Sequence, residues 1–262
     1  MRKQYPTAAA CICNVGKRRA KNEDDFYIYG RTRGGEEILK KPLYFRQNKR
    51  DDFDGSWQFY AVFDGMGGGD YGDVASQTAA LGAKEFLKDK NNIQPYDITI
   101  SLKAMSNDLN KKVCHTANNL GTKRMGTTLC SLFFYEGMFW VCNLGDSRAY
   151  LLRNGKIFRL SKDHTDEEEM KKLNITGIKP QVTQYLGIDP EETRIVPFIR
   201  SADMLKDDVF LICSDGLTDM VSIDTIKQTM ASRKNVADCV TRLMDAALKA
   251  GGKDNITIIA IE

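Results

Sequence analysis

The sequence predicts an α+β protein built as a four-layer α-β-β-α sandwich, in which two antiparallel sheets face each other and a pair of helices covers each sheet. Three observations support this prediction. Apolar strands follow one another in runs, tight-turn signals join several of them, and helical patterns occur in adjacent pairs. A doubly wound parallel sheet would instead alternate single strands with single helices, so the layered antiparallel arrangement is favoured.

The N-terminal part of the chain is rich in strand signals. Three segments have the β-rich composition of strands: 7–16, 24–30 and 57–65. A polar turn separates the first two. A polar, glycine-containing and basic excursion at 31–56 precedes the third, and we expect it to be a solvated hairpin rather than a docking surface for acidic or phosphorylated partners.

A pair of helices follows the third strand. Apolar residues at three- and four-residue steps predict helices over roughly 71–89 and 97–118. We expect the second helix to bury a face that is represented by Ile100, Met105, Leu109 and Val113.

A β-meander occupies the middle of the chain. Its expected strands are 127–135, 138–145, 147–153 and 156–160. The pairs Glu136-Gly137 and Asn154-Gly155 stand at the two hairpin turns, and Asn-Gly is a strong signal for a two-residue turn.

The C-terminal part begins with a less regular segment, 161–205, which contains a short helix that Thr165 could cap. The remaining expected elements are a strand at 208–216, helices near 222–231 and 235–249, and a last strand at 255–262. Because no repeat, low-complexity run or linker divides the chain, we expect one domain over residues 1–262.

Composition excludes several classes of protein. A net charge of +3 is too small to indicate nucleic-acid binding, and no apolar run approaches the length of a membrane span. The N-terminal stretch does not resemble a secretory signal. Seven scattered cysteines favour reduced, structural thiols and a cytoplasmic location, with a metal site at Cys11 and Cys13 as the less favoured alternative.

Acidic residues at the ends of apolar strands are the most informative local feature. "YAVFDGMGGG" ends on Asp64, and "VFLICSDG" repeats the design at Asp215. No Ser, Cys or His beside Asp64 could act as a nucleophile. Asp and Gly are common turn residues, so one such ending would mean little, but two of them suggest a shared site.

These motifs resemble the metal-dependent serine/threonine protein phosphatases of type 2C, specifically the bacterial-type members. The matches appear in the family order from about residue 14 to residue 261. They are "RAKNEDD", "VFDGMGG", "RMGTTLCSL", "NLGDSRAYLL", "VTQYLG", "ICSDGLTD" and "KDNITIIAI". Seven ordered matches are a specific signal, whereas a single one would be weak.

The resemblance implies a centre of two metal ions at one end of the sandwich. Asp64 would bridge both ions and Gly65 would offer its carbonyl oxygen. Asp215 and Asp254 would hold the first ion, and Glu23 would reach the second through water. Converging carboxylates repel one another unless cations lie between them, and oxygen ligands without His or Cys select Mn²⁺ or Mg²⁺.

The resemblance also implies roles for the residues around the ions. Asp24 would orient the water that bridges the ions, which explains why the motif needs no protein nucleophile. Arg19, three residues before Asn22, would bind the substrate phosphate by a bidentate guanidinium contact, and this spacing favours it over its neighbour Arg18.

Further features of the family bear on access to the site. A third, weaker metal site is implied at Asp146, together with Asp215 or Asp219. Residues 161–205 fall where the family has a mobile flap that governs substrate access, although a solvated loop with a short helix is compatible with the same residues.

One position departs from the pattern of some family members. Met66 stands where those members have a histidine that protonates the leaving alcohol, although bacterial-type relatives often carry Met there. The proton donor therefore stays open between a metal-bound water, an unassigned side chain and His164.

The leading hypothesis is hydrolysis of phosphoserine and phosphothreonine in proteins. The alternative is a non-catalytic partner-binding module, but such modules normally lose metal-holding acids, and here Asp64, Asp215 and Asp254 are present. An aspartyl phosphotransferase would need a second Asp at position 66. We expect a monomer that acts on phosphorylated proteins, opposing a cognate serine/threonine kinase or acting on a single regulatory protein, and that binds neither nucleic acid nor membrane.

Overall fold

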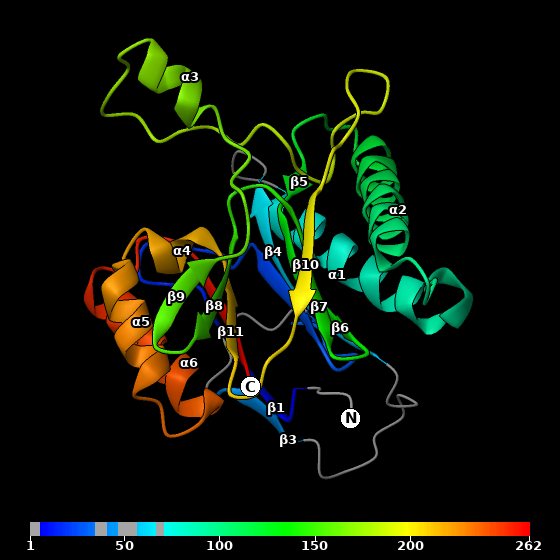
Figure 1. The fold of residues 1–262 in the computed structure, drawn as a ribbon. Helices are drawn as coiled ribbons and strands as arrows, with labels where there is room; N and C mark the ends of the chain where they lie inside the picture. The colour runs from blue at the N-terminus through cyan, green and yellow to red at the C-terminus, as the bar shows by residue number, and fades with distance from the viewer. Residues whose placement is uncertain (1–5, 35–40, 47–56, 67–70) are drawn as a thin grey trace.

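The computed structural model describes residues 6–34, 41–46, 57–66 and 71–262, and it contains two antiparallel sheets (Figure 1). The first sheet has the strand order β3 (Leu43–Arg46), β1 (Ala8–Asn14), β12 (Ile256–Ile261), β11 (Val209–Cys213), β8 (Arg148–Arg153), β9 (Lys156–Arg159). The second has the order β10 (Phe198–Asp203), β7 (Met138–Leu144), β6 (Leu129–Tyr135), β4 (Trp57–Met66), β2 (Asp24–Ile28), and β5 (Gly126–Thr127) pairs with the end of β4.

Helices cover the outer face of each sheet, as the sequence predicts. The second sheet packs against α1 (Gly72–Lys88) and α2 (Ile98–Asn119), which a short 3₁₀ helix (Lys90–Asn92) connects. The first sheet packs against α4 (Asp215–Thr218), α5 (Ile223–Ala231) and α6 (Val236–Lys249). The two helix groups lie on opposite sides of the molecule in Figure 1. The four-layer prediction is therefore confirmed.

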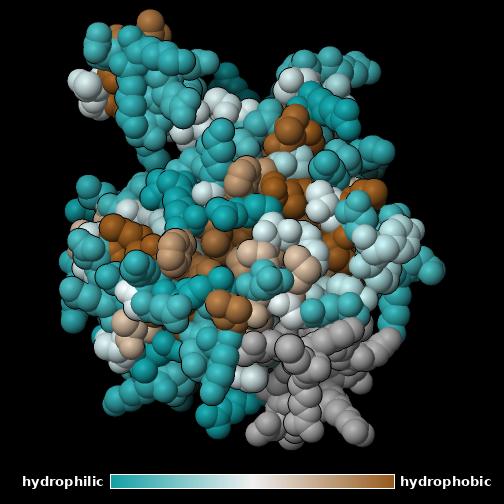
Figure 2. All heavy atoms as spheres, viewed as in Figure 1, coloured by the Kyte–Doolittle hydropathy of each residue, from teal (hydrophilic) through white to brown (hydrophobic). Residues whose placement is uncertain are grey.

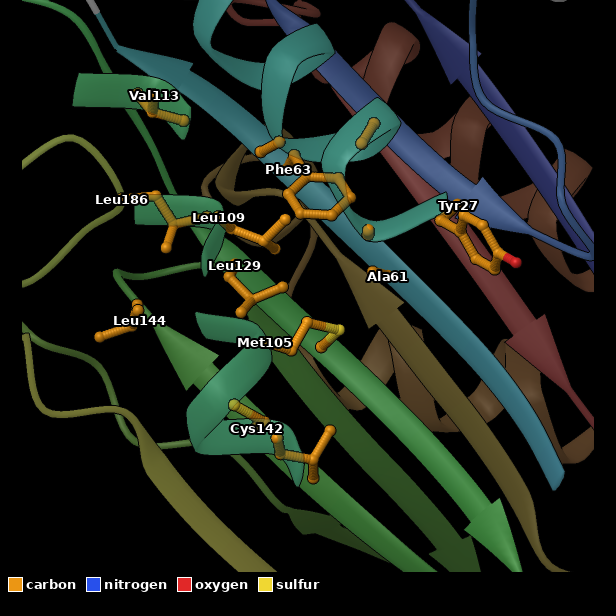
Figure 3. Close-up of a cluster of buried hydrophobic side chains, with 14 of the residues drawn as sticks. Tyr27, Ala61, Phe63, Met105, Leu109, Val113, Leu129, Cys142, Leu144 and Leu186 are labelled. Atoms are coloured by element: carbon orange, nitrogen blue, oxygen red, sulfur yellow. The ribbon is translucent and has the colours of Figure 1, made fainter. Parts of the chain in front are cut away.

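Three apolar cores hold the layers together. Phe134 and Phe139 of the second sheet contact Phe210 of the first, with ring centroids 5.1 and 4.8 Å apart, in the core between the sheets. In the core under the helices, Leu109 of α2 lies near Phe63 and Leu129 of the sheet (Figure 3). A core on each face of both sheets explains why the central strands are apolar along nearly their whole length.

Local sequence signals account for most element boundaries. The hairpin turns have positive φ at Glu136, Gly137, Asn154 and Gly155, as a type I′ turn requires. The N-terminus of α6 is capped by the Asn235 side chain, which accepts a hydrogen bond of 2.9 Å from the backbone N–H of Asp238. These turns and caps determine where the strands and helices begin and end.

Some local expectations are wrong. Ile100 is 48% exposed, although the other three residues expected on its face are buried. The N-cap residue of α3 (Glu167–Lys172) is Asp166 rather than Thr165. Thr165 instead forms an isolated β-bridge with Val182. The helix therefore begins one residue later than the Thr165 cap implies.

The segment 161–205 contains a strand that was not expected, β10, which pairs with β7. In the excursion at 31–56, which was expected to be a solvated hairpin, the described residues form β3, which pairs with β1. Arg33 of the excursion is only 7% exposed, so it is not part of a solvated surface. The predictions for 35–40 and 47–56 lie outside the described residues.

The segment 161–205, called the flap segment below, projects from the body at α3 (Figure 1). Its two arms are joined at the base, since the N–H groups of Asp166 and Thr183 donate to the carbonyls of Gln181 and His164. Figure 2 shows hydrophobic atoms at the tip of this projection, where Leu173, Ile175 and Ile178 are exposed.

All seven cysteines are free thiols, and Cys130, Cys142, Cys213 and Cys239 are buried as expected. Among the described residues, no helix is long and apolar enough to cross a membrane.

Candidate metal centre

The sheet registers bring acidic residues from distant parts of the chain to one end of the sandwich. Asp24 of β2 lies directly opposite Asp64 of β4, and opposite residues of an antiparallel pair point to the same face. On the other sheet, β11 pairs with β12, so Asp215 just after β11 and Asp254 just before β12 come to the same end.

A pocket of about 480 Å³ lies between these strand ends. It is lined by Arg19, Glu23, Asp64, Gly65, Met66, Asp146, Lys179, Pro180, Val182, Asp215 and Asp254. The pocket thus gathers the five expected ligands of the metal pair together with the expected phosphate-binding arginine and Asp146. Of the other expected site residues, Asp24 lies buried behind the pocket and Asp219 lies beside it, in contact with Lys179.

Glycines permit the close approach of the chain segments around the pocket. The Gly65 N–H donates to the Glu23 carbonyl at 3.1 Å, and a Cβ on Gly65 would lie 2.1 Å from the Gly72 carbonyl oxygen. A Cβ on Gly72 would lie 2.7 Å from the Glu23 carboxylate. Any larger residue would therefore push Glu23 and the start of α1 away from Asp64.

The carboxylates carry unbalanced negative charge. Burial, followed by the charges of Asp215, Asp24, Asp146 and Asp254, raises the pKa of Asp64 well above its usual range. Burial and then the Asp215 charge raise the pKa of Asp146 to about 6. A cation placed among these oxygens would relieve the repulsion and favour the ionised forms.

Two basic side chains partly offset this charge. The Arg19 guanidinium lies 2.7 Å from the Asp254 carboxylate. Lys179 of the flap segment forms ion pairs with Asp215 and, at 2.8 Å, with Asp219. Arg18 is exposed and does not line the pocket, so the structure distinguishes it from Arg19.

A hydrogen-bond network fixes the Asp24 side chain. The hydroxyls of Ser214 and Thr257 both donate to Asp24 Oδ2, at 2.7 and 2.8 Å. Asp24 Oδ1 is buried and has no hydrogen-bond partner among the described residues. Burial raises the pKa of Asp24 to about 7 although the two hydroxyls oppose this shift. One oxygen is thus anchored and the other is available to a water.

The residues present fit Mn²⁺ or Mg²⁺. The pocket offers carboxylate oxygens and the Gly65 carbonyl, without His or Cys, which is the donor set that these hard cations prefer. In the ranges that the structure describes, no three His, Cys, Asp or Glu side chains already surround one ion position. Arg19 and Lys179 form ion pairs with Asp254 and Asp215, two of the expected ligands.

The structure does not favour a metal site at Cys11 and Cys13. Both thiols are buried in the core between the sheets. The Cys13 sulfur accepts a hydrogen bond from the Asn22 side-chain amide and lies 3.0 Å from the Thr257 hydroxyl. Burial raises the pKa of Cys13 to about 12, so the thiol stays protonated.

His164 and Met66 take different positions relative to the pocket. Met66 lines it and offers no proton. His164 does not line it, and its Nδ1 accepts a hydrogen bond of 3.3 Å from the Gly145 N–H, which holds the loop before Asp146. The geometry therefore indicates a structural role for His164.

Asn255 is a site residue that sequence reasoning missed, although it lies in the quoted motif "KDNITIIAI". Its side chain donates to the carbonyls of Val15 and Lys21 at 2.9 and 3.0 Å and accepts from the Glu23 N–H at 2.8 Å. It thus clamps the loop that carries Arg19 and Glu23 to the start of β12. Nothing in the local pattern of residues 15–23 reveals this distant partner.

We expect Asn255→Ala to lower the free energy of unfolding by about 2 kcal/mol, because it removes three part-buried hydrogen bonds, two to the carbonyls of Val15 and Lys21 and one from the Glu23 N–H. Urea unfolding measures the loss. The matched control Asn118→Ala, at an exposed position near the end of α2, should change it by less than about 0.5 kcal/mol. Equal stability of both variants would contradict the clamp.

The raised pKa of Asp24 should make the stability of the metal-free protein depend on pH. Its folded-state pKa of about 7 exceeds the value of about 3.9 for an exposed Asp, so between these pH values the folded state binds more protons. Stability from this group is present at low pH and is lost as the pH rises towards 7. Asp24→Asn should match the wild type in urea unfolding at pH 5 and exceed it by about 2 kcal/mol at pH 8. A constant difference would contradict the raised pKa.

Comparison with known proteins gives consistent matches. A family model described as protein phosphatase 2C matches residues 36–256. The serine/threonine phosphatase stp of Listeria monocytogenes is 29% identical over 214 residues, 77% of this chain and 82% of that protein. The family model thus includes Asp64, Asp146, Asp215 and Asp254, but begins after the loop that carries Arg19 and Glu23.

Solved structures match nearly the whole chain. The serine/threonine phosphatase Stp1 of Staphylococcus aureus is 26% identical, with a TM-score of 0.79 over 100% of this chain and 96% of that one. The catalytic domain of the serine/threonine protein phosphatase PstP, solved in complex with two manganese ions, is 26% identical, with a TM-score of 0.74 over 98% and 99% of the two chains.

Proposed function

The chain belongs to the protein phosphatase 2C family and is a metal-dependent protein serine/threonine phosphatase, and from this premise we propose that it hydrolyses phosphoserine and phosphothreonine in the acidic pocket, at a pair of Mn²⁺ or Mg²⁺ ions. The observation that carries the proposal is the convergence of Glu23, Asp64, Asp215 and Asp254 from four separate segments on one pocket. Repelling carboxylates around a polar pocket are the arrangement that divalent cations stabilise.

We assign the metal-holding roles from this arrangement. Asp64 would contact both ions and Gly65 would add its carbonyl oxygen. Asp215 and Asp254 would hold the first ion, and Glu23 would reach the second through water. When bound, two such ions lower the pKa of a water and neutralise charge on phosphoryl oxygens, which would supply much of the roughly 20 kcal/mol of barrier reduction that phosphate-monoester hydrolysis requires.

Other residues would bind and orient the reactants. Arg19 would bind the phosphate once its guanidinium leaves Asp254, because phosphate accepts the same paired N–H groups as a carboxylate. Asp24 would orient the attacking water through Oδ1, while Ser214 and Thr257 keep Oδ2 in place. Asp146 and Asp219 would contribute to a weaker third site.

The wider setting is proposed on the same basis. We place the protein in the cytoplasm, where its seven free thiols would stay reduced, and we take residues 1–262 as one phosphatase domain that acts as a monomer. Its partners would be phosphorylated proteins and, through them, a cognate serine/threonine kinase. The PstP structure with two manganese ions supports Mn²⁺ as one of the usable metals.

Phosphate release from synthetic phosphopeptides tests the proposal. With Mn²⁺ or Mg²⁺ present, we expect release from phosphoserine and phosphothreonine peptides, little release from a phosphotyrosine peptide, and loss of activity when EDTA is added. Restoring an excess of Mn²⁺ should restore activity. Absence of release at saturating Mn²⁺, or release that EDTA does not affect, would overturn the proposal.

A further inference from the structure

Lys179 reaches the acidic pocket from the flap segment. Its ammonium group pairs with Oδ2 of Asp215 and with Oδ2 of Asp219, and its side chain lines the pocket with those of Pro180 and Val182. The Lys179 charge also acts on Asp146, where it opposes the increase in pKa. The single positive charge of Lys179 thus acts on Asp215 at the start of α4, on Asp219 just after its end, and on Asp146 in the loop after β7.

This lysine is the fastening point of the exposed part of the flap segment. Residues 171–179 are all exposed, and α3, which ends at Lys172, stands away from the body (Figure 1). Among the described residues, Lys179 is the member of 167–180 whose side chain forms a hydrogen bond or ion pair with a residue outside the flap segment. Without this contact, the base contacts at Asp166 and Thr183 would still hold, but 171–179 would lack a polar attachment to the body.

The position of the ammonium group is one that a divalent cation would also favour. Asp215 is a proposed ligand of the first ion, and Asp219 is the C-cap residue of α4, four residues further along the chain. A lysine ammonium can neutralise such a pair of carboxylates, but it does so with one charge and from a flexible stem. A divalent cation brings twice the charge to the same oxygens, so both cations cannot hold them fully at once.

We propose that Lys179 is an intramolecular counter-ion that competes with a divalent cation for Asp215 and Asp219, so that the flap segment is fastened over the pocket in the metal-free protein and is released when the ion binds. The proposal rests on the proposed function in naming Mn²⁺ or Mg²⁺ as the competing ion. Because coupling between two binding events is reciprocal, fastening of the flap segment lowers metal affinity by the same factor by which metal binding loosens the flap segment.

Calorimetric titration with Mn²⁺ tests the competition without using activity. We expect Lys179→Met to bind Mn²⁺ about tenfold more tightly than the wild type at the weakest of the sites that the titration resolves. A tenfold change lies within the usual range for coupling between two binding events. The matched control is Lys172→Met, which removes the same charge from an exposed position of the same segment and should change the affinity less than about twofold. Equal affinities for Lys179→Met and the wild type, or equal gains in both variants, would overturn the proposal.

Limited digestion with chymotrypsin tests the release of the flap segment. Cleavage after Met170 or Leu173 reports the opening of this segment, since proteolysis follows the population of the open form. In the wild type we expect Mn²⁺ to accelerate cleavage, whereas Lys179→Met should be cleaved rapidly with or without the metal. If Mn²⁺ leaves the wild-type rate unchanged, the fastening is refuted. Should Mn²⁺ bind and phosphate be released normally in that case, the proposed function stands and this inference alone fails.

Discussion

Replacing Asp64 by asparagine is expected to lower kcat for phosphopeptide hydrolysis by several orders of magnitude and, at the same time, to make the metal-free protein more stable. Asp64 is the residue proposed to contact both ions, so an uncharged amide at this position weakens both sites at once. Burial and four neighbouring carboxylates disfavour its ionised form in the metal-free state, and asparagine removes that repulsion.

Steady-state kinetics and urea unfolding without metal measure the two effects. We expect a gain of about 0.5–2 kcal/mol in the free energy of unfolding, as for other stabilising substitutions at functional sites. Asp215→Asn should also lose activity, whereas Asp245→Asn, an exposed carboxylate of α6, should behave as the wild type. Activity retained in both Asp64→Asn and Asp215→Asn would refute the assigned site.

Removal of the Arg19 side chain is expected to lower kcat/KM about 100-fold, because charge-assisted hydrogen bonds to a phosphate contribute roughly 1.5–3 kcal/mol. Arg18→Ala is the matched control, since Arg18 carries the same side chain one position earlier but does not line the pocket. It should remain within about twofold of the wild type.

Arg19→Lys gives a further distinction. Lysine keeps the charge but cannot present two parallel N–H groups, so we expect only partial recovery of kcat/KM. Similar losses in Arg18→Ala and Arg19→Ala would show that general positive charge, rather than a specific contact, binds the phosphate.

The strands and their turns could be predicted because their signals are local. Asn154-Gly155 adopts the positive φ values that such a pair tolerates, and the apolar runs of β4, β11 and β12 are apolar because both of their faces are buried. Two acids at the ends of such runs predict a shared site once the two strands are assigned to facing sheets and end at the same end of the sandwich.

Elements that depend on a distant partner could not be predicted in this way. The pattern of β10 alternates only weakly, and the strand exists because β7 offers an edge with which it pairs. Ile100 has helical spacing but lies beyond the area that the sheet covers. The flap segment gives no sequence sign that Lys179 meets acids 36 and 40 residues away, and the Asn255 clamp likewise joins segments more than 230 residues apart.

Anomalous diffraction from crystals of the protein grown with Mn²⁺ tests the central claim most directly. Two strong manganese peaks are predicted in the pocket, one on each side of the Asp64 carboxylate, with Asp215 and Asp254 at the first ion and Glu23 near the second. Manganese peaks that lie away from these four carboxylates, or no peaks at a saturating concentration of Mn²⁺, would contradict the account.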